Sequence, residues 1–259
     1  MEKSTSSTLM TEGSIWKKII AFAVPLFLGN LFQQLYNTAD SLIVGNFLGS
    51  NALAAVSSSG NLIFLMVGFV SGIAIGAGVV IARYYGARRH GDVQKAIHTT
   101  IAFGLAAGVV LTVIGVVLAP IILVWMGTPA DVLPESTVYF RTYFAGSLSF
   151  VMYNVFVGIL QSVGDSRHPL VYLIISSFIN IVLDLVLVGI FHFGVGAAAF
   201  ATILSLIHIY AAVVTDRIIH KGLMFQSILL LQRISLCIAG HIYISVHPKS
   251  PSHTVINRL

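Results

Sequence analysis

Charged residues are scarce in this sequence. Asp, Glu, Lys and Arg make up 9% of its 259 residues, whereas a soluble domain typically carries about 25%. Cysteine is nearly absent: Cys237 alone cannot form an internal disulfide, and no Cys/His spacing predicts a metal site. The basic residues lie in short segments between apolar runs and form no stripe, so we expect no nucleic-acid partner. These shortages exclude an ordinary soluble domain and a disulfide scaffold.

The sequence is instead rich in long apolar runs. Hydrophobic residues make up 57% of the chain, and about 20 in a row can cross a hydrocarbon core about 30 Å thick. We therefore predict an all-α integral membrane protein, with a cytoplasmic N-terminal segment at 1–18 and a six-helix transmembrane bundle at 19–206. The predicted spans lie near 19–42, 59–82, 97–124, 137–160, 169–192 and 194–206.

The basic residues predict the orientation of the bundle. Lys and Arg occur in the N-terminal segment and in every second connection, as Lys17, Lys18, Arg83, Arg88, Arg89, Lys95 and Arg167. By the positive-inside rule, these segments and the N-terminus are cytoplasmic. Arg141, at the outer end of the fourth span, is the exception, and its long side chain can reach the interface.

The first span carries a polar stripe. In "FLGNLFQQLYNTADSLIVGNFLG" (27–49), six polar residues fall within an arc of about 120° on a helix. They are Asn30, Gln33, Gln34, Asn37, Asp40 and Ser41. An unsatisfied polar group facing lipid costs several kcal/mol, so we expect this stripe to face protein or water.

The fifth span repeats the arrangement, with Ser177, Asn180 and Asp184 on one face. Neither Asp40 nor Asp184 has a Lys or Arg partner within a span. If the two acids lie close together, they could hold one proton or bind a monovalent cation. The structural alternative is that each acid is a protonated, hydrogen-bonded core residue. Asn180, and likewise Gln34 and Asn37, could instead serve only interhelical hydrogen bonds.

Small residues and prolines shape the other spans. Gly68, Gly72 and Gly76 repeat every four residues in the second span, and Gly104 and Gly108 do so in the third, which predicts close helix packing. Pro25 can kink or hinge the first span.

Tyr139 and Tyr143, in the fourth span, could line a cavity or anchor the membrane interface, and their place near the end of the span favours the interface.

Four stretches together resemble the amino-terminal half of a bacterial multidrug and toxic compound extrusion (MATE) transporter. They are "PLFLGNLFQQLYNTADSLIVGNFLG", "GFVSGIAIGAGVVIARYYGARR", "GILQSVGDSRHP" and "NIVLDLVLVGIFHFGVGAAAFAT". The resemblance covers about 14–203 and implies a plasma-membrane antiporter that exports cationic or amphipathic compounds in exchange for H⁺ or Na⁺, with no other cofactor. Family members have twelve helices in two lobes around a central cavity, so the resemblance implies one lobe here, with the C-terminal lobe missing.

The resemblance also assigns roles to residues. Asp40 and Asp184 correspond to the acids that bind the coupling ion, and Asn180 and Thr202 to polar residues of the same site. Gln34 and Tyr139 resemble residues that line the cavity or its hydrogen-bond network, and Asn37 shares their stripe. The implied mechanism is alternating access, in which ion binding reshapes the first helix and the cavity.

The end of the chain departs from this pattern. "LSLIHI" at 204–209 resembles the translation of a transposon end used in sequencing libraries, and 207–259 holds five of nine His but two of 23 Gly. We interpret 207–259 as a chimeric or frame-shifted tail, the alternative being a divergent soluble or interfacial segment.

Three other functions remain open at this stage. A relative that moves lipid-linked saccharides would share the helix count but typically use a basic cavity. An intramembrane aspartyl protease would also use two acids, and "SVGD" at 162–165 approaches its Gly-x-Gly-Asp signature. The third is a truncated, non-functional membrane fragment.

Overall fold

The computed structural model describes residues 14–213, with side chains through His208. This part of the chain is all helical and contains no strand. Its elements are α1 (Ile15–Leu48), α2 (Ser50–Gly86), α3 (His90–Trp125), α4 (Leu133–Ala145), α5 (Ser147–Ser162), α6 (Arg167–Asp184), the π-helical segment η1 (Leu185–Ile190) and α7 (Val195–Val213). The all-α prediction is confirmed for these residues.

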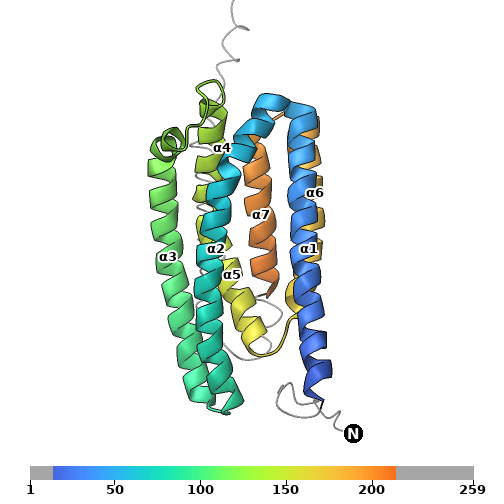
Figure 1. Ribbon diagram of the computed structural model, residues 1–259, viewed down its shortest axis with the longest axis vertical. Coiled ribbons are helices and arrows are strands. Elements are labelled where there is room, and N and C mark those ends of the chain that lie inside the picture. Colours follow the sequence, from blue (N-terminus) through green and yellow to red (C-terminus); the bar gives the residue numbers. More distant parts are fainter. Residues whose placement is uncertain (1–13, 214–259) are drawn as a thin grey trace, which may run out of the picture.

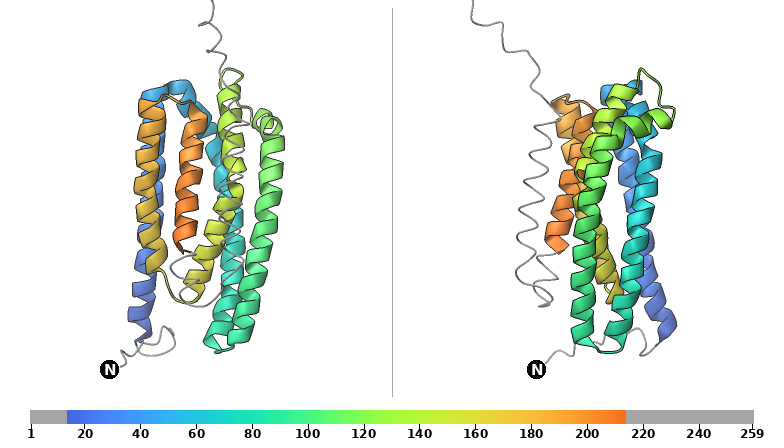
Figure 2. Two further views of the ribbon diagram at one scale, coloured as in Figure 1. Left: turned by 180° about the vertical axis from the view of Figure 1, so that it is seen from behind. Right: turned by 90° about the vertical axis from the view of Figure 1, so that its left-hand side faces the viewer.

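The helices run along one common axis, and short connections reverse the chain at each end (Figure 1). Gly49 alone separates α1 from α2, and its φ of 90° lies in the left-handed region that favours glycine. α7 lies within the bundle against α4, α5 and α6, while α1 packs on α6 and α3 packs on α4 and α5 (Figure 2). The buried core between these helices includes Ile97, Leu123, Phe140 and Phe156.

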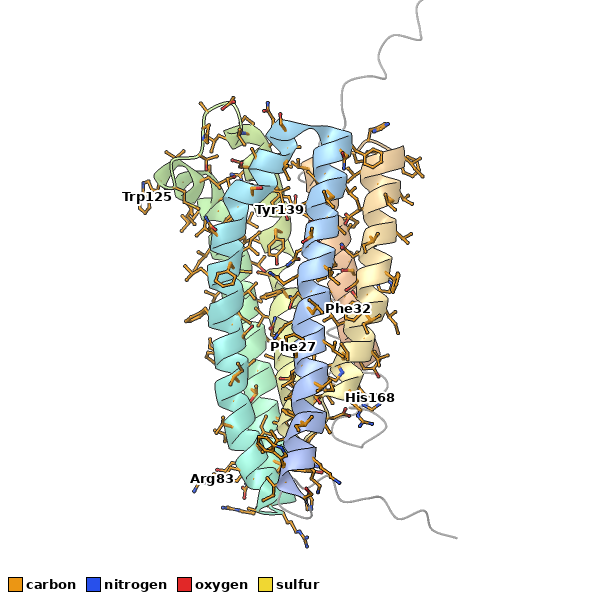
Figure 3. The ribbon with its side chains drawn as sticks, turned by 45° about the vertical axis from the view of Figure 1, so that its right-hand side comes forward. Phe27, Phe32, Arg83, Trp125, Tyr139 and His168 are labelled. Atoms are coloured by element: carbon orange, nitrogen blue, oxygen red, sulfur yellow. The ribbon has the colours of Figure 1, made fainter. Side chains whose placement is uncertain are left out.

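The outer surface of the bundle is apolar. Phe27, Phe178 and Trp125 are 68%, 66% and 84% exposed, and Phe27 and Trp125 can be followed in Figure 3. Within the described residues, four helices are long and apolar enough to cross a membrane, and the bent pair α4–α5 would add a fifth if it forms one span. Exposed apolar side chains on such helices belong in contact with lipid rather than with water.

The described residues form seven α-helices and a π-helical segment, so the prediction of six helices is not confirmed. The fourth predicted span, 137–160, is broken into α4 and α5, which meet at 48°. Gly146 occupies the break, and a Cβ there would collide with Ile203 of α7. A Gly-Ser pair is a common cause of such a bend. The fifth predicted span, 169–192, changes to π-helix directly after Asp184.

α7 begins at Val195, next to the predicted start of the sixth span, and continues to Val213, beyond the predicted end at 206. Leu206 and Ile207 are buried, so the segment after 204 continues the packing of this helix. The rest of the predicted tail, 214–259, lies outside the described residues, as do residues 1–13 of the predicted N-terminal segment.

The packing role predicted for the glycines holds on one helix and fails on the other. A Cβ at Gly104 or Gly108 of α3 would lie 2.8 Å from Val155 or 2.6 Å from Leu148 of α5. A Cβ at Gly68, Gly72 or Gly76 of α2 would meet nothing within 4 Å. The prediction was therefore correct for α3, whereas the α2 glycines face outward.

Candidate functional site

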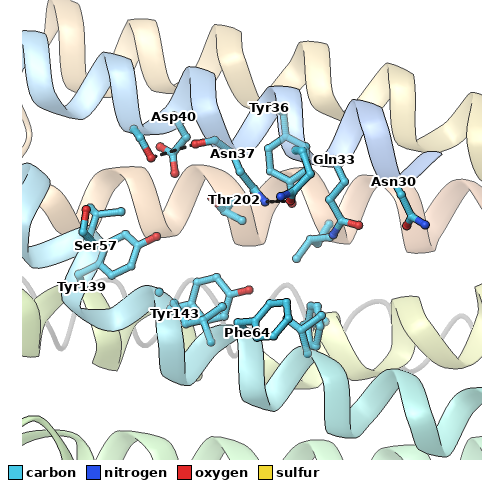
Figure 4. Close-up of a pocket in the computed structure, with 18 residues that line it drawn as sticks. Asn30, Gln33, Tyr36, Asn37, Asp40, Ser57, Phe64, Tyr139, Tyr143 and Thr202 are labelled. Atoms are coloured by element: carbon cyan, nitrogen blue, oxygen red, sulfur yellow. Dashed lines mark hydrogen bonds between the residues drawn. The ribbon is translucent and has the colours of Figure 1, made fainter. Parts of the chain in front are cut away.

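The polar stripe of α1 forms one wall of a cavity of about 500 Å³ (Figure 4). All six residues of the predicted stripe line it: Asn30, Gln33, Gln34, Asn37, Asp40 and Ser41. The facing side chains include Ser57 and Phe64 of α2, Tyr139 and Tyr143 of α4, and Thr202 of α7. Among the described residues, no Lys or Arg lines this cavity. It therefore offers amides and an acid on one side and largely aromatic and apolar surface on the other.

The amides of the stripe bond along their own helix. Asn37 Nδ2 donates to Gln34 Oε1 at 3.3 Å, and Ser41 Oγ donates to the Asn37 carbonyl at 3.0 Å. These hydrogen bonds lie within α1. The alternative expectation for Gln34 and Asn37 was hydrogen bonds between helices. Both side chains are exposed toward the cavity, where a ligand or water can reach them.

Asp40 and Asp184 lie together although they come from different spans. Asp40 is 8% exposed on α1, Asp184 is fully buried at the end of α6, and the two carboxyl groups interact directly. Ionised carboxylates only accept hydrogen bonds, so this contact becomes a hydrogen bond only when one acid carries a proton. No basic residue forms an ion pair with either acid within the described part of the chain.

Asn180 extends the acid pair, one helical turn before Asp184. Its Oδ1 and Nδ2, both Asp184 oxygens and Asp40 Oδ1 are buried without a hydrogen-bond partner when both acids are ionised. Unpaired buried polar atoms are costly, and in native structures they often mark a site for an ion, a proton or water. Between 14 and 213, no three His, Cys, Asp or Glu side chains gather as a metal site.

The structure therefore divides the predicted site residues into two adjoining groups. Gln34, Asn37, Asp40, Tyr139 and Thr202 line the cavity. Asp184 and Asn180 lie behind Asp40, outside the cavity lining. Thr202 Oγ1 donates to the Ala198 carbonyl of its own helix at 3.1 Å, which leaves its oxygen lone pairs for another partner.

The interfacial placement favoured for Tyr139 and Tyr143 is wrong, because both are buried, at 5% and 9% exposed, and line the cavity. Sequence reasoning also left Tyr36 and Ser57 out of the site. Tyr36 lies one turn before Asp40 on the same face, so helical periodicity could have found it. Ser57 is a single hydroxyl in an apolar span, and no local pattern marks it.

The polar face of α1 continues into a second cavity of about 280 Å³ nearer the N-terminal end of the helix. The two cavities share Asn30 and Gln33. Ser71 Oγ of α2 donates to Asn154 Oδ1 of α5 at 3.0 Å in its wall. The buried Pro25 also lines it, so the helix position without a backbone donor lies beside polar space.

The protease signature has no support in this geometry. Asp165 lies in the connection between α5 and α6, where it interacts with His168 Nδ1 at 2.6 Å, and it lines neither of these two cavities. His168 marks the end of the bundle at which α1 begins (Figure 3). This acid is therefore separated from the Asp40–Asp184 pair.

Comparison with known proteins identifies the family of this chain. The family model described as MatE matches residues 25–186, more than half of the chain, including both acids. The chain belongs to the MatE family. This match confirms the resemblance to MATE transporters that the sequence showed.

Curated relatives of this MatE chain are named as probable multidrug resistance proteins. A probable multidrug resistance protein, YoeA of Bacillus subtilis, is 37% identical over 198 residues, which is 75% of this chain and 43% of YoeA. The probable multidrug resistance protein NorM of Thermotoga maritima is 28% identical over 195 residues, covering 74% of this chain and 42% of NorM. The MatE chain thus spans less than half the length of these relatives.

Solved structures show the same fold. A crystal structure of MATE in the bent conformation has a TM-score of 0.79 at 26% identity, covering 94% of this chain and 57% of that one. An equally similar transporter of the MOP superfamily from Pyrococcus furiosus, with a TM-score of 0.78, is described as having a binding pocket of reverse polarity. The cavity lining that residues 14–208 of the MatE chain form contains an acid and no base, which argues against the basic cavity expected of a saccharide exporter.

Proposed function

We propose that this MatE chain forms the amino-terminal lobe of an antiporter that exchanges H⁺ or Na⁺ for cationic or amphipathic compounds by alternating access. The observation that carries the proposal is the Asp40–Asp184 pair, buried beside a polar cavity without a basic partner. The names of the relatives support drugs as substrates, and the acid and aromatic rings of the cavity favour cationic or amphipathic ones. The setting is the bacterial plasma membrane, with the N-terminus in the cytoplasm.

The chemistry of the pair suits a monovalent coupling ion. One proton shared between the carboxyl groups removes the repulsion between two negative charges in a medium of low dielectric constant. A sodium ion would do the same and would use the carboxylate oxygens and Asn180 Oδ1, which are the oxygen ligands that hard cations prefer. Thr202 Oγ1 is the next oxygen at the cavity edge. The proposal therefore holds for either ion.

Ion binding and substrate binding are coupled through Asp40, because this residue belongs to both the pair and the cavity wall. An unneutralised pair attracts a cationic substrate into the cavity, while amides and aromatic rings accept its apolar and polar parts. Binding of H⁺ or Na⁺ removes that attraction and weakens substrate binding. By linkage, substrate must weaken ion binding by the same factor.

Alternating access requires a second wall that moves against this lobe. The chain spans 43% of its YoeA relative, so we propose that the remaining half of such a transporter, the C-terminal lobe, supplies the opposite wall. Gln34, Asn37 and Tyr139 then contact substrate, while Asp40, Asp184, Asn180 and Thr202 hold the ion.

The test is ethidium efflux from drug-sensitive bacteria that express a chimera, in which residues 14–213 replace the matching part of YoeA. We expect efflux from the chimera, and loss of at least about 100-fold in rate with Asp40→Asn or Asp184→Asn, since either change removes the charge that couples ion and drug. Asp131→Asn, which neutralises an exposed acid in the connection before α4, is the matched control and should retain efflux.

Two results would contradict the proposal. Normal efflux in both acid variants would remove the pair from the coupling site. A chimera that reaches the membrane at normal levels but exports nothing would favour the alternative of a non-functional membrane fragment. Membrane levels are measured in parallel, so that loss of activity is separated from loss of protein.

A further inference from the structure

A second large hollow lies on the opposite side of α2 from the site. It has a volume of about 630 Å³ and runs between α2 and α3 with α5 as its floor. Its walls are almost wholly apolar, and the rims include Phe69 and Val80 of α2 and Phe103 and Val110 of α3, each about half exposed or more. Figures 1 and 2 show the two helices side by side, joined at the end where the chain begins.

Small residues create this groove. Ala77 on α2 and Ala96 and Ala107 on α3 line it, with Val151 and Val155 buried beneath them. Gly104 brings α3 onto α5, since a Cβ there would lie 2.8 Å from Val155 Cγ2. α3 is thus drawn toward α5, while a channel remains open between α2 and α3. Because the channel lies on the apolar outer surface, the surrounding lipid has direct access to it.

One end of the groove carries unbalanced positive charge. Lys95 and Asp92 both line it. Asp92 is already paired, because its Oδ2 lies 2.7 Å from Arg89 Nη2, and the Arg89 guanidinium lies over the Tyr84 ring at 5.3 Å. Lys95 has no ion-pair partner within residues 14–213, and the exposed Arg83 lies at the same end of the bundle (Figure 3). The groove therefore combines an apolar channel with a cationic mouth.

We propose that the groove between α2 and α3 is a binding site for an anionic phospholipid, with one acyl chain in the channel and the phosphate beside Lys95. The groove is long enough: Lys95 to Val110 spans about 22 Å of helix at 1.5 Å per residue, which exceeds the hydrocarbon depth of one leaflet, about 15 Å. Hydroxyl groups of Tyr84 and Thr99, which also line the mouth, are in place to contact the headgroup.

The occupant is a lipid rather than a protein segment, because the apolar channel matches an acyl chain and Lys95 matches an anionic headgroup. A transmembrane partner helix would fill the apolar channel but would leave Lys95 without a counter-charge. Basic residues beside membrane helices attract anionic lipids through their headgroups. The site is independent of the Asp40–Asp184 pair and stands whether or not the proposed transport activity is correct.

The experiment is native mass spectrometry of the full chain in detergent, titrated with phosphatidylglycerol and with phosphatidylcholine of the same acyl chains. We expect the unaltered chain to bind phosphatidylglycerol at least about fivefold more tightly, since each basic residue near a headgroup contributes about that factor. Lys95→Glu should remove the preference. Ala107→Phe should weaken binding of both lipids by filling the channel.

Two matched variants serve as controls. Lys17→Glu reverses a charge at the same end but on α1, and Ala102→Phe makes the same substitution at an exposed position of α3 outside the groove. Both should bind lipid as the unaltered chain does, and thermal unfolding confirms that all variants are folded.

The proposal is overturned if the unaltered chain shows no preference, if Lys95→Glu keeps it, or if Lys17→Glu loses it equally. Channel binding is overturned if Ala107→Phe binds both lipids normally. Inorganic phosphate should not compete with the lipid, and full competition by phosphate would indicate a simple anion site instead.

Discussion

Pro120 lies within α3 without ending the helix. A proline has no backbone N–H, so the carbonyl of Val116, four residues earlier, loses its normal helical donor. Arg141 of α4 supplies another, because its Nε donates to this carbonyl at 3.2 Å. The sequence suggested only that Arg141 reaches for the interface. The structure shows that Arg141 also donates a hydrogen bond to the carbonyl that Pro120 leaves without a helical donor.

We predict that Arg141→Met lowers the free energy of unfolding by about 1–2 kcal/mol, because it leaves the Val116 carbonyl without a donor. In a Pro120→Ala background, residue 120 regains its N–H, and the same substitution should cost about 1 kcal/mol less. Chemical unfolding in detergent of the four chains of this cycle measures the difference. An equal cost in both backgrounds would show that Arg141 stabilises the bundle in some other way.

Asn180 supports a prediction that separates function from stability. Both polar atoms of its amide are buried without a partner, and such atoms cost about 1–3 kcal/mol. Asn180→Leu should therefore raise the thermal midpoint of the lobe while abolishing ethidium efflux in the YoeA chimera.

Asn37→Leu is the comparison for this prediction, because its amide is exposed and already bonded to Gln34. It should give no gain in stability. A lower midpoint in Asn180→Leu would mean that the amide stabilises the lobe and is not reserved for an ion.

At the scale of helices, equal sequence spacing has unequal consequences. The glycines of α2 and α3 repeat with the same period, but Gly108 lies against Leu148, whose Cα would be 3.0 Å from an added Cβ, whereas Gly72 faces open space. Which face of a helix meets a neighbour depends on the rotation of the whole helix. The sequence predicts the period but not this rotation.

Gly108→Ala should therefore destabilise the bundle by about 1–3 kcal/mol, because α3 must move away from the α5 backbone. Gly72→Ala, its matched control, should be neutral or stabilising by up to about 1 kcal/mol, since alanine is the better helix former. The midpoint of thermal unfolding in detergent distinguishes the two. Equal effects would contradict the packing that the structure assigns to Gly108.

The arrangement of α4 to α7 also depends on contacts between helices. Span four bends where Ile203 of α7 packs on Gly146, and Ser176 Oγ of α6 donates to the Ser205 carbonyl of α7 at 2.8 Å. These contacts place Thr202 at the cavity and the end of α6 beside α1. Hydropathy cannot foresee them, because it measures the length of a span and not its partners.

At the scale of the whole molecule, the basic connections gather at one end. The start of α1, the connection at 87–89 and the connection at 163–166 all lie there, and Trp125 marks the other end (Figures 1 and 3). This asymmetry is what the positive-inside rule uses, and we propose that the basic end is cytoplasmic.

Cysteine labelling in intact cells tests this orientation. In a Cys237→Ser background, a membrane-impermeant maleimide should label Asp131→Cys, which lies in the connection between α3 and α4, without permeabilisation. His90→Cys, at the start of α3 on the basic end, should react only after the membrane is opened. The reverse pattern would invert the proposed topology.

The sequence alone determined the membrane setting, the helical class and the polar face of α1, because each depends on local composition or on a period of 3.6 residues. It also identified Asp40 and Asp184 as unusual acids, since charge is costly anywhere within a span. Only the tertiary structure decided that these acids meet, that Tyr139 and Tyr143 turn inward, and that Lys95 ends an apolar groove. Those relations depend on which helix faces meet, and that is determined by packing across the whole bundle.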